Sequence, residues 1–377
     1  MNLQELDKFN SEELFAKVKR RIKNNDLISE YYESLNEETG HDIYLTRSNA
    51  IKSCCKLWDC DYYRIQGVKD VKRTNHCWSK FCDNCGNAKA VAREQKFKPL
   101  LDLLSKTYDL YHIVLTVPNC ESFELLRVVD KILNSFGQLY RLFRGNVKIK
   151  NLDFSRYNSI GAIRAIEITK NYKTNTMHPH LHCIFVFNKK LKLDKVGKSH
   201  KNKYSYTNAD NEKKFSKNRL FSDFEILIQK LWYLKYNDIK ITKNALDSLK
   251  LGYSCICENA DGDYHQIFKY ATKGIFKDNL TYGYIDFKNL ETALHKRKII
   301  QGYGVLNKFN FDINNDYESQ IDEEYQKMLD KLKSIEDPIR IFEFLKDIDF
   351  KIQAPKVKYI SKQSLRKAFI EEKEQKK

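Results

Sequence analysis

Three of the nine histidines lie within five residues, in the segment Met177-His-Pro-His-Leu-His182. Successive side chains of a β-strand point to opposite faces, so His180 and His182 share a face if this segment is extended. His178 joins them only if the strand continues past Pro179, which cannot donate to a strand ladder. Two imidazoles at this spacing predict a site for one divalent ion, and they suit Mn, Zn or a similar metal.

An acidic third ligand would suit an ion that activates a phosphate. Glu167 lies in the preceding expected strand, and a turn centred near Lys173 would place it opposite His180. We therefore predict Glu167 as the third ligand, with His178 as the alternative. A structural zinc site is the competing interpretation, but such sites usually recruit cysteine.

A second set of metal-binding residue types lies in the region 50–90, which holds six of the ten cysteines. Cys77, Cys82 and Cys85 have a spacing typical of zinc sites, and CxxC presents two thiolates to one ion. The fourth ligand has three upstream candidates, namely Cys54, Cys55 and Cys60. In a reducing cytoplasm a metal site is favoured over disulfides, and free thiols are the main alternative.

The net charge of +17 predicts attraction to polyanions, of which nucleic acid is the commonest. A Lys-rich composition is the competing explanation. However, residues 316–377 hold 14 basic and 14 acidic residues, so the whole excess lies in residues 1–315. Six basic residues flank the cysteines and suggest contact with DNA phosphates: Lys69, Lys72, Arg73, Lys80, Lys89 and Arg93.

Several segments have the periodicity needed to position these residues. Helices are expected over 11–35, 91–105, 122–143, 221–236 and 266–272, and strands over 111–117, 161–169 and 180–187. The order predicts an α+β fold, with an antiparallel sheet covered by helices. The segment 188–219 holds 11 basic and three acidic residues and is expected to be a loop, either a solvated insertion or a contact to the DNA backbone.

Four parts of the chain are expected. They are an N-terminal helical segment (1–49), a Cys-rich zinc-binding module (50–95), a central nuclease domain (96–310) and a charged helical C-terminal region (311–377). No run of 18 apolar residues occurs, and the first ten residues lack the apolar core of a secretory signal. We therefore expect a cytoplasmic protein without a membrane partner.

The histidine segment resembles the motif of the HUH endonucleases, in which a bulky hydrophobic residue separates two histidines. More narrowly, the chain is similar to bacterial plasmid initiators of rolling-circle replication. Leu115-Thr-Val-Pro-Asn119 resembles the first motif of that family, and Lys298-Ile-Ile-Gln-Gly-Tyr-Gly304 its closing motif. The resemblance spans roughly residues 50–305. It implies a palm-like sheet, a Mg or Mn ion at the histidines, and a substrate of single-stranded and hairpin origin DNA.

The resemblance also assigns a nucleophile among the 23 tyrosines. The family motif is a Tyr followed three residues later by Lys, which Tyr270 and Lys273 match. Several relatives carry a Glu four residues before the tyrosine to activate water, and Gln266 stands there instead. An amide cannot accept that proton, so Glu258, Asp261, Asp263 or the Tyr270 of a second subunit would have to end the reaction. Tyr282 and Tyr284 are weaker nucleophile candidates.

The same family pattern places a Cys four residues before a large hydrophobic residue, which selects Cys54 and Trp58 among the three candidates. The implied partners are a host helicase and DNA polymerase and, as a possible homodimer, a second copy of the chain. Two other functions remain open: an HUH transposase, and a non-catalytic zinc-dependent DNA-binding protein. Paired tyrosines one helical turn apart would favour the transposase, but Gln266 and Gly274 occupy those positions around Tyr270.

Overall fold

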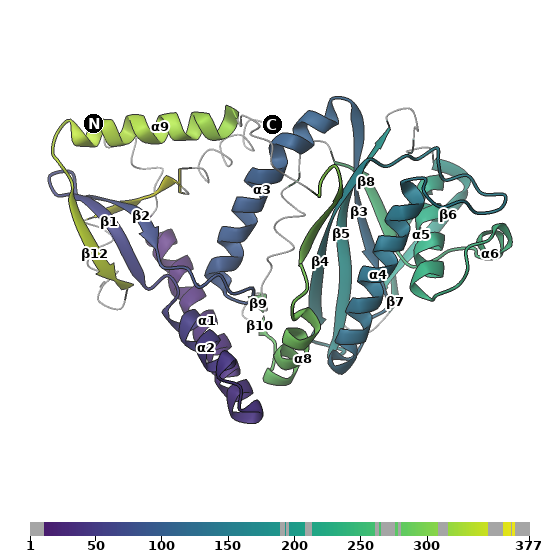
Figure 1. Cartoon of the computed structure of the whole chain (residues 1–377), viewed down its shortest axis with the longest axis horizontal. Helices are drawn as coiled ribbons and strands as arrows, with labels where there is room; N and C mark the ends of the chain where they lie inside the picture. The colour runs from purple at the N-terminus through teal and green to yellow at the C-terminus, as the bar shows by residue number, and fades with distance from the viewer. Residues whose placement is uncertain are drawn as a thin grey trace. The chain divides into compact units, whose positions relative to one another are not determined.

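A computed structural model describes most of the chain (Figure 1). The described residues are 11–188, 193, 196–207, 213–260, 264, 276–277, 280–307, 316–345, 357–362 and 364–365. Residues 87, 196–207, 213–220, 276–277, 280–281 and 316–320 are described by their backbone alone. The chain divides into two compact units, one of Met1–Lys89 with Ile313–Lys377 and one of Ala90–Asp312.

The first unit combines helices from both ends of the chain with a four-stranded sheet. Its sheet has the order β12-β1-β2-β13, in which β1 and β2 form an antiparallel hairpin and β13 runs parallel to β2. The elements are α1 (Ser11–Thr39), α2 (Asp42–Ser53), β1 (Leu57–Tyr63), β2 (Val68–Thr74), the start of α3 (Asp83–Ser105), α9 (Asp316–Lys333), β12 (Ile339–Phe344) and β13 (Lys358–Ile360).

The C-terminal region departs from the charged helices expected there. Helix α9 is present, but β12 and β13 follow it and form the two outer strands of the sheet. The apolar stripe of α9, with Ile321, Met328 and Leu332, packs against Tyr63 and Val68 of the β1–β2 hairpin. The segment is thus one side of the core of this unit, and burial of its few apolar side chains outweighs its high charge.

The second unit is built around an antiparallel five-stranded sheet of order β11-β4-β5-β3-β8. The sheet strands are β3 (Tyr108–Thr116), β4 (Gly161–Asn171), β5 (Thr176–Asn188), β8 (Cys255–Asn259) and β11 (Ile300–Gly304). The other elements are η2 (Ser122–Glu124), α4 (Leu125–Phe143), β6 (Val196–Thr207), β7 (Lys213–Ser222), α5 (Asp223–Tyr236), α6 (Lys243–Ser248), β9 (Phe276–Lys277), β10 (Leu280–Thr281) and α8 (Tyr284–Leu294). This arrangement confirms the α+β class with antiparallel strands.

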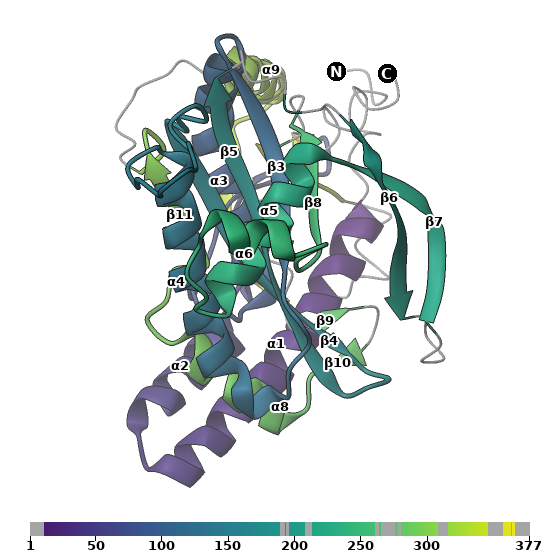
Figure 2. The ribbon, with the colours of Figure 1, turned by 90° about the vertical axis from the view of Figure 1, so that its right-hand side faces the viewer.

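Helices α4 and α5 cover one face of this sheet (Figures 1 and 2). The contact is aromatic: Phe143 of α4 packs edge-on against Phe185 and Phe187 of β5, and Phe224 of α5 also packs against Phe187. Since side chains alternate along β5, His180 and His182 lie on the face that these helices leave uncovered.

Glycines 302 and 304 of the predicted closing motif have a clear steric role in β11. Gly304 has a φ of +58°, and a Cβ there would lie 2.1 Å from the carbonyl oxygen of Ile160. A Cβ on Gly302 would lie 1.9 Å from the carbonyl oxygen of Leu306. Both positions require glycine, because the backbone passes too close for any side chain.

Residues 188–219, expected to be a loop, contain an antiparallel pair. Strands β6 and β7 form a two-stranded ribbon separate from the main sheet (Figure 2). The β-prone residues Tyr204, Tyr206 and Phe215 in this lysine-rich stretch are a local signal that its charge obscured. The expected helix 266–272 lies outside the described residues. Among those described, no helix has the length and apolar character that a membrane crossing requires.

Candidate metal centres

The histidine segment forms part of β5, the central strand of the five-stranded sheet. Its neighbours are β4 and β3, and the register pairs His180 with Glu167 on one side and with Thr116 on the other. The expected alignment of Glu167 with His180 is therefore confirmed. Because directly paired residues of an antiparallel sheet share a face, Glu167, His180 and His182 all project from the same side.

The three side chains converge on one carboxylate oxygen. Oε2 of Glu167 lies 2.8 Å from Nε2 of His180 and 2.9 Å from Nε2 of His182. All three residues are buried, and their ligand atoms lie within 4.8 Å of one another. Burial opposes ionisation of the carboxyl, but the hydrogen bonds from His180 and His182 prevail and lower the pKa of Glu167 to about 2. A buried carboxylate thus faces two ring nitrogens.

The hydrogen bond on the far side of His180 fixes its tautomer. Nδ1–H donates to the carbonyl oxygen of His178 over 3.1 Å. A neutral imidazole so held has its lone pair at Nε2, directed at an oxygen of Glu167 that also carries lone pairs. A proton between the two atoms gives the hydrogen bond to Glu167, and a cation in its place would be ligated by both atoms, so the donor set fits a metal ion.

The structure adds two neighbours that the sequence analysis did not identify. Nε2 of His112, on β3, lies 3.2 Å from Nδ1 of His182, and the two rings are stacked. Asn119 accepts a hydrogen bond of 2.7 Å from Nδ1 of His178 and donates one of 3.0 Å to Thr176. His112 and Thr116 lie four residues apart on β3 and so share a face, but the sequence did not indicate how β3 aligns with β5.

His178 does not belong to the convergent group. Its ring lies next to that of His180, with centroids 5.0 Å apart, but its Nδ1 is engaged by Asn119. Burial, together with the charge of His180, lowers the pKa of His178 to about 4. Of the two candidates for third ligand, the geometry therefore brings Glu167, rather than His178, to the pair.

The predicted nucleophile Tyr270 and its helper Lys273 lie outside the described residues, as does Gln266. Of the weaker candidates, Tyr282 is 5% exposed and its hydroxyl donates to the carbonyl oxygen of Ile168 over 2.8 Å. Burial raises the pKa of Tyr282, so its phenol is held protonated and is poorly suited to nucleophilic attack.

The cysteine cluster of the first unit brings four thiols together. Sγ of Cys54 lies 3.4 Å from that of Cys82 and 3.5 Å from that of Cys85, and Cys77 lies 3.7 Å from Cys85. Thiolates on a tetrahedral zinc ion, with Zn–S near 2.3 Å, are roughly 3.8 Å apart. Of the three upstream candidates, Cys54 joins the set, while Cys60 is buried in β1.

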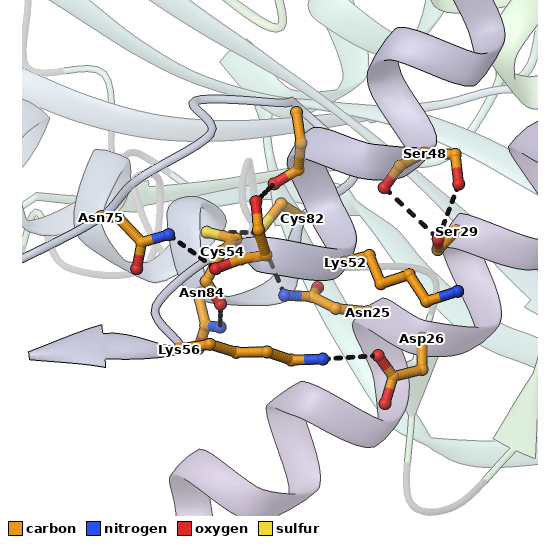
Figure 3. A network of polar contacts seen from close by, with 12 residues as sticks. Asn25, Asp26, Ser29, Ser48, Lys52, Cys54, Lys56, Asn75, Cys82 and Asn84 are labelled. Atoms are coloured by element: carbon orange, nitrogen blue, oxygen red, sulfur yellow. Dashed lines mark hydrogen bonds and ion pairs between the residues drawn. The ribbon is translucent and has the colours of Figure 1, made fainter. Parts of the chain in front are cut away.

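Backbone amides point at the sulfur atoms, as thiolates require. The N–H of Trp78 donates to Cys85 over 3.2 Å, and that of Cys77 donates to Cys54 over 3.5 Å. The side-chain amide of Asn25, on α1, also donates to Sγ of Cys82 over 3.3 Å (Figure 3). Hydrogen bonds to the anionic form favour it, and these donors therefore prepare the cluster for a cation.

The basic residues around the cluster have different environments. Lys69 is buried and paired with Glu343 of β12, so it is not available to a phosphate. Lys80 and Lys89 are partly exposed, and Lys89 donates to the carbonyl oxygen of Trp78. Arg93 is partly exposed, and burial lowers its pKa.

Trp78 is an exposed aromatic residue that the sequence did not single out as a functional candidate. Its indole is 57% exposed, and its backbone has a φ of +56°. A large aromatic residue in a left-handed conformation next to a cysteine cluster is unusual. Its place between Cys77 and Lys80 was visible in the sequence, but its exposure was not.

Comparison with known proteins gives matches to one family. Residues 68–196 match the family model described as replication protein. Three relatives are each called "Protein rep". They are from a Bacillus species (21% identical over 159 residues, 42% of this chain and 48% of the relative), Streptococcus pneumoniae (29% over 126 residues, 33% and 36%) and Staphylococcus aureus (27% over 125 residues, 33% and 50%).

The alignments thus span half or less of the relatives' own length. The family match contains Glu167, His180 and His182 together with Cys77, Cys82 and Cys85. The resemblance to replication initiators that the motifs indicated is thereby confirmed. No solved structure matches the chain.

Proposed function

We propose that this chain, which matches the replication protein family over residues 68–196, starts rolling-circle replication of a plasmid by cutting one DNA strand. The observation that carries the proposal is the buried convergence of Glu167, His180 and His182 on the face of the sheet opposite helices α4 and α5. A purely structural metal site rarely combines a carboxylate with two imidazoles, whereas an ion that activates a phosphate prefers such mixed ligands.

The chain's own residues would hold and orient the reacting phosphate. When bound, a divalent ion such as Mg or Mn would polarise the phosphate oxygen and position the scissile bond. Glu167 remains ionised at neutral pH and supplies the negative charge. The carbonyl of His178 and the ring of His112 hold the two ligand imidazoles in place from behind.

Tyr270 is the proposed nucleophile, with Lys273 balancing charge beside it. The phenol loses its proton and its oxygen attacks phosphorus, while the 3′ oxygen leaves and takes up a proton; this gives a 5′-phosphotyrosine link and a free 3′-hydroxyl. That hydroxyl primes a host polymerase, and a host helicase opens the duplex. A later attack by a 3′-hydroxyl on the same link recloses the strand without ATP.

The end of a replication round needs a base or a second nucleophile, because Gln266 cannot accept a proton. Among the three acidic alternatives, Glu258 is described, and Asp261 and Asp263 lie outside the described residues. Glu258 is exposed on β8 and pairs directly with His112, which shares the face of the metal ligands. We propose Glu258 as the alternative base, and the Tyr270 of a second subunit as the other route.

The cysteine module would contact the DNA backbone. Lys80, Lys89 and Arg93 are the proposed phosphate contacts, and the exposed indole of Trp78 offers a surface for stacking an unpaired base. A structural zinc ion at Cys54, Cys77, Cys82 and Cys85 would hold this module together. The substrate is single-stranded or hairpin origin DNA, and the reaction takes place in the cytoplasm, where plasmid DNA lies.

The test is covalent capture of the DNA strand. The full chain is incubated with a single-stranded hairpin oligonucleotide from the plasmid origin and Mn²⁺, and the denatured protein is separated by electrophoresis. Wild type is expected to shift to a slower covalent adduct. Tyr270→Phe and His182→Ala should not form it, whereas Tyr282→Phe should. Non-covalent binding by all four proteins without any adduct would instead favour a DNA-binding protein that does not cut.

A further inference from the structure

Two further metal-binding side chains lie beside the four-cysteine set. Sγ of Cys55 is 3.9 Å from that of Cys54 and 3.4 Å from Nδ1 of His76. The same nitrogen of His76 is 3.7 Å from Sγ of Cys85. Cys54, Cys55 and His76 form a convergent group of their own, with ligand atoms within 4.8 Å of one another. Neither the zinc-like spacing nor the family pattern accounts for Cys55 and His76.

The contacts form two convergent donor sets, one of four residues and one of three, that share Cys54. The first set has Cys77 and Cys82 as its outer members, and the second has Cys55 and His76. Sγ of Cys85 lies 3.5 Å from that of Cys54 and 3.7 Å from Nδ1 of His76, so this thiol of the first set also borders the second. We propose that the module binds two divalent ions of the zinc type, bridged by the thiolates of Cys54 and Cys85.

Backbone geometry supports a role for Cys55 beyond packing. Cys55 has a φ of +58°, a left-handed conformation that L residues adopt only at an energetic cost. Its N–H donates over 2.6 Å to the carbonyl oxygen of Asn75, which directly precedes His76. The strained residue therefore brings the two donors together, and such strain persists mainly where a function requires it.

His76 is held as metal-ligating histidines are. Its Nε2 lies 3.2 Å from the hydroxyl of Thr74, which leaves Nδ1 directed at Cys55 and Cys85. A second-sphere partner on one ring nitrogen orients the other toward the ion. Thr74 also lies 3.6 Å from Sγ of Cys55, so one hydroxyl is near both outer donors of the second set.

Charge also favours two ions over one. Four of the five clustered cysteines are buried, namely Cys54, Cys55, Cys82 and Cys85. One divalent ion held by four thiolates leaves two negative charges in a site of low polarity, whereas two ions with five thiolates and a neutral histidine leave one. The guanidinium of Arg21, which interacts with Cys55 and Cys82, would offset part of the remainder.

Metal counting tests the proposal, which does not depend on the strand-cutting reaction. The full chain carrying His180→Ala and His182→Ala serves as the parent, so that only cysteine-bound ions are counted. Native mass spectrometry and elemental analysis after zinc loading should give two ions per chain. Adding Cys55→Ser and His76→Ala should reduce the count to one. Cys60→Ala, which removes a buried thiol of the same module outside both sets, should leave it at two.

Two results would overturn the proposal: one ion in the parent, or two ions that survive the loss of Cys55 and His76. If the variant fails to fold, ¹¹³Cd NMR of the parent decides the question. Two thiolate-bound cadmium resonances, coupled through the shared sulfurs, are expected. A single resonance, or two without coupling, would show that Cys54 and Cys85 bridge no pair of ions.

Discussion

Replacing Glu343 with glutamine should destabilise the first unit far more than the loss of an ordinary surface charge would. Glu343 of β12 pairs with Lys69 of β2, and their side chains are 15% and 7% exposed. Tyr359 of β13 completes the network: its hydroxyl donates to Glu343 over 3.2 Å and accepts from Lys69 over 3.3 Å. One buried ion pair thus joins three strands, two of which come from the C-terminal region.

Glu343→Gln keeps the shape of the side chain but leaves the ammonium of Lys69 buried without a counter-charge. Breaking a buried pair from one side costs about 3 to 5 kcal/mol. The control is Asp26→Asn, which breaks a pair with Lys56 that is 3.1 Å long but 43% and 33% exposed. That substitution should cost about 0.5 kcal/mol.

Urea unfolding followed by circular dichroism measures both costs. A third variant, Lys69→Met with Glu343→Leu, removes the pair altogether and should recover most of the lost stability, because no unpaired charge remains. The reasoning is refuted if Glu343→Gln costs no more than Asp26→Asn, or if the double substitution is no more stable than Glu343→Gln alone. Either result would mean that the Lys69–Glu343 pair does not stabilise the first unit as a buried ion pair.

Three further results are expected. Cys82→Ser should release metal from the first unit and lower its unfolding temperature, as should a chelator on wild type, measured by metal analysis and calorimetry. Trp78→Ala should weaken single-stranded DNA binding by about 1–3 kcal/mol in a fluorescence titration, with an unchanged unfolding temperature because the ring is exposed. Hydrogen bonds from Arg340 and Arg73 lower the pKa of Asp59 to about 2. Its contribution to stability is therefore complete above about pH 4 and lost as the pH falls toward 2, so the stability difference between wild type and Asp59→Asn should shrink over that range.

The histidine site could be predicted because its geometry is local. Two strands joined by a short turn have a register that the turn position fixes, and the period of two then determines which side chains share a face. Those rules sufficed to pair Glu167 with His180. The same rules could not place His112. Helix α4 and strand β4 separate β3 from β5 in the sequence, so the alignment of β3 with β5 depends on the assembly of the whole sheet.

The C-terminal strands could not be predicted for a related reason. Ile339 pairs with Tyr62, and Phe344 with Leu57, across almost the full length of the chain. The alternation in Ile339–Phe344 is short and interrupted by charge, so on its own it resembles a loop or a frayed helix. The buried ion pair with Lys69 explains why the acidic residue Glu343 lies in β12. Nothing in the sequence indicated that these two residues would meet.

The two candidate metal centres place different demands on the fold. The donors of the histidine site lie on the adjacent sheet strands β4 and β5, so the sheet can assemble them before any ion binds. The cysteine donors come from the end of α2, the segment after β2 and the first turn of α3, and Cys54 and Cys85 share no strand pairing. Because these donors come from three segments that share no strand ladder, we expect metal binding and folding to be coupled in the first unit. Chelation should then unfold the cysteine module while the five-stranded sheet and its histidine face remain intact.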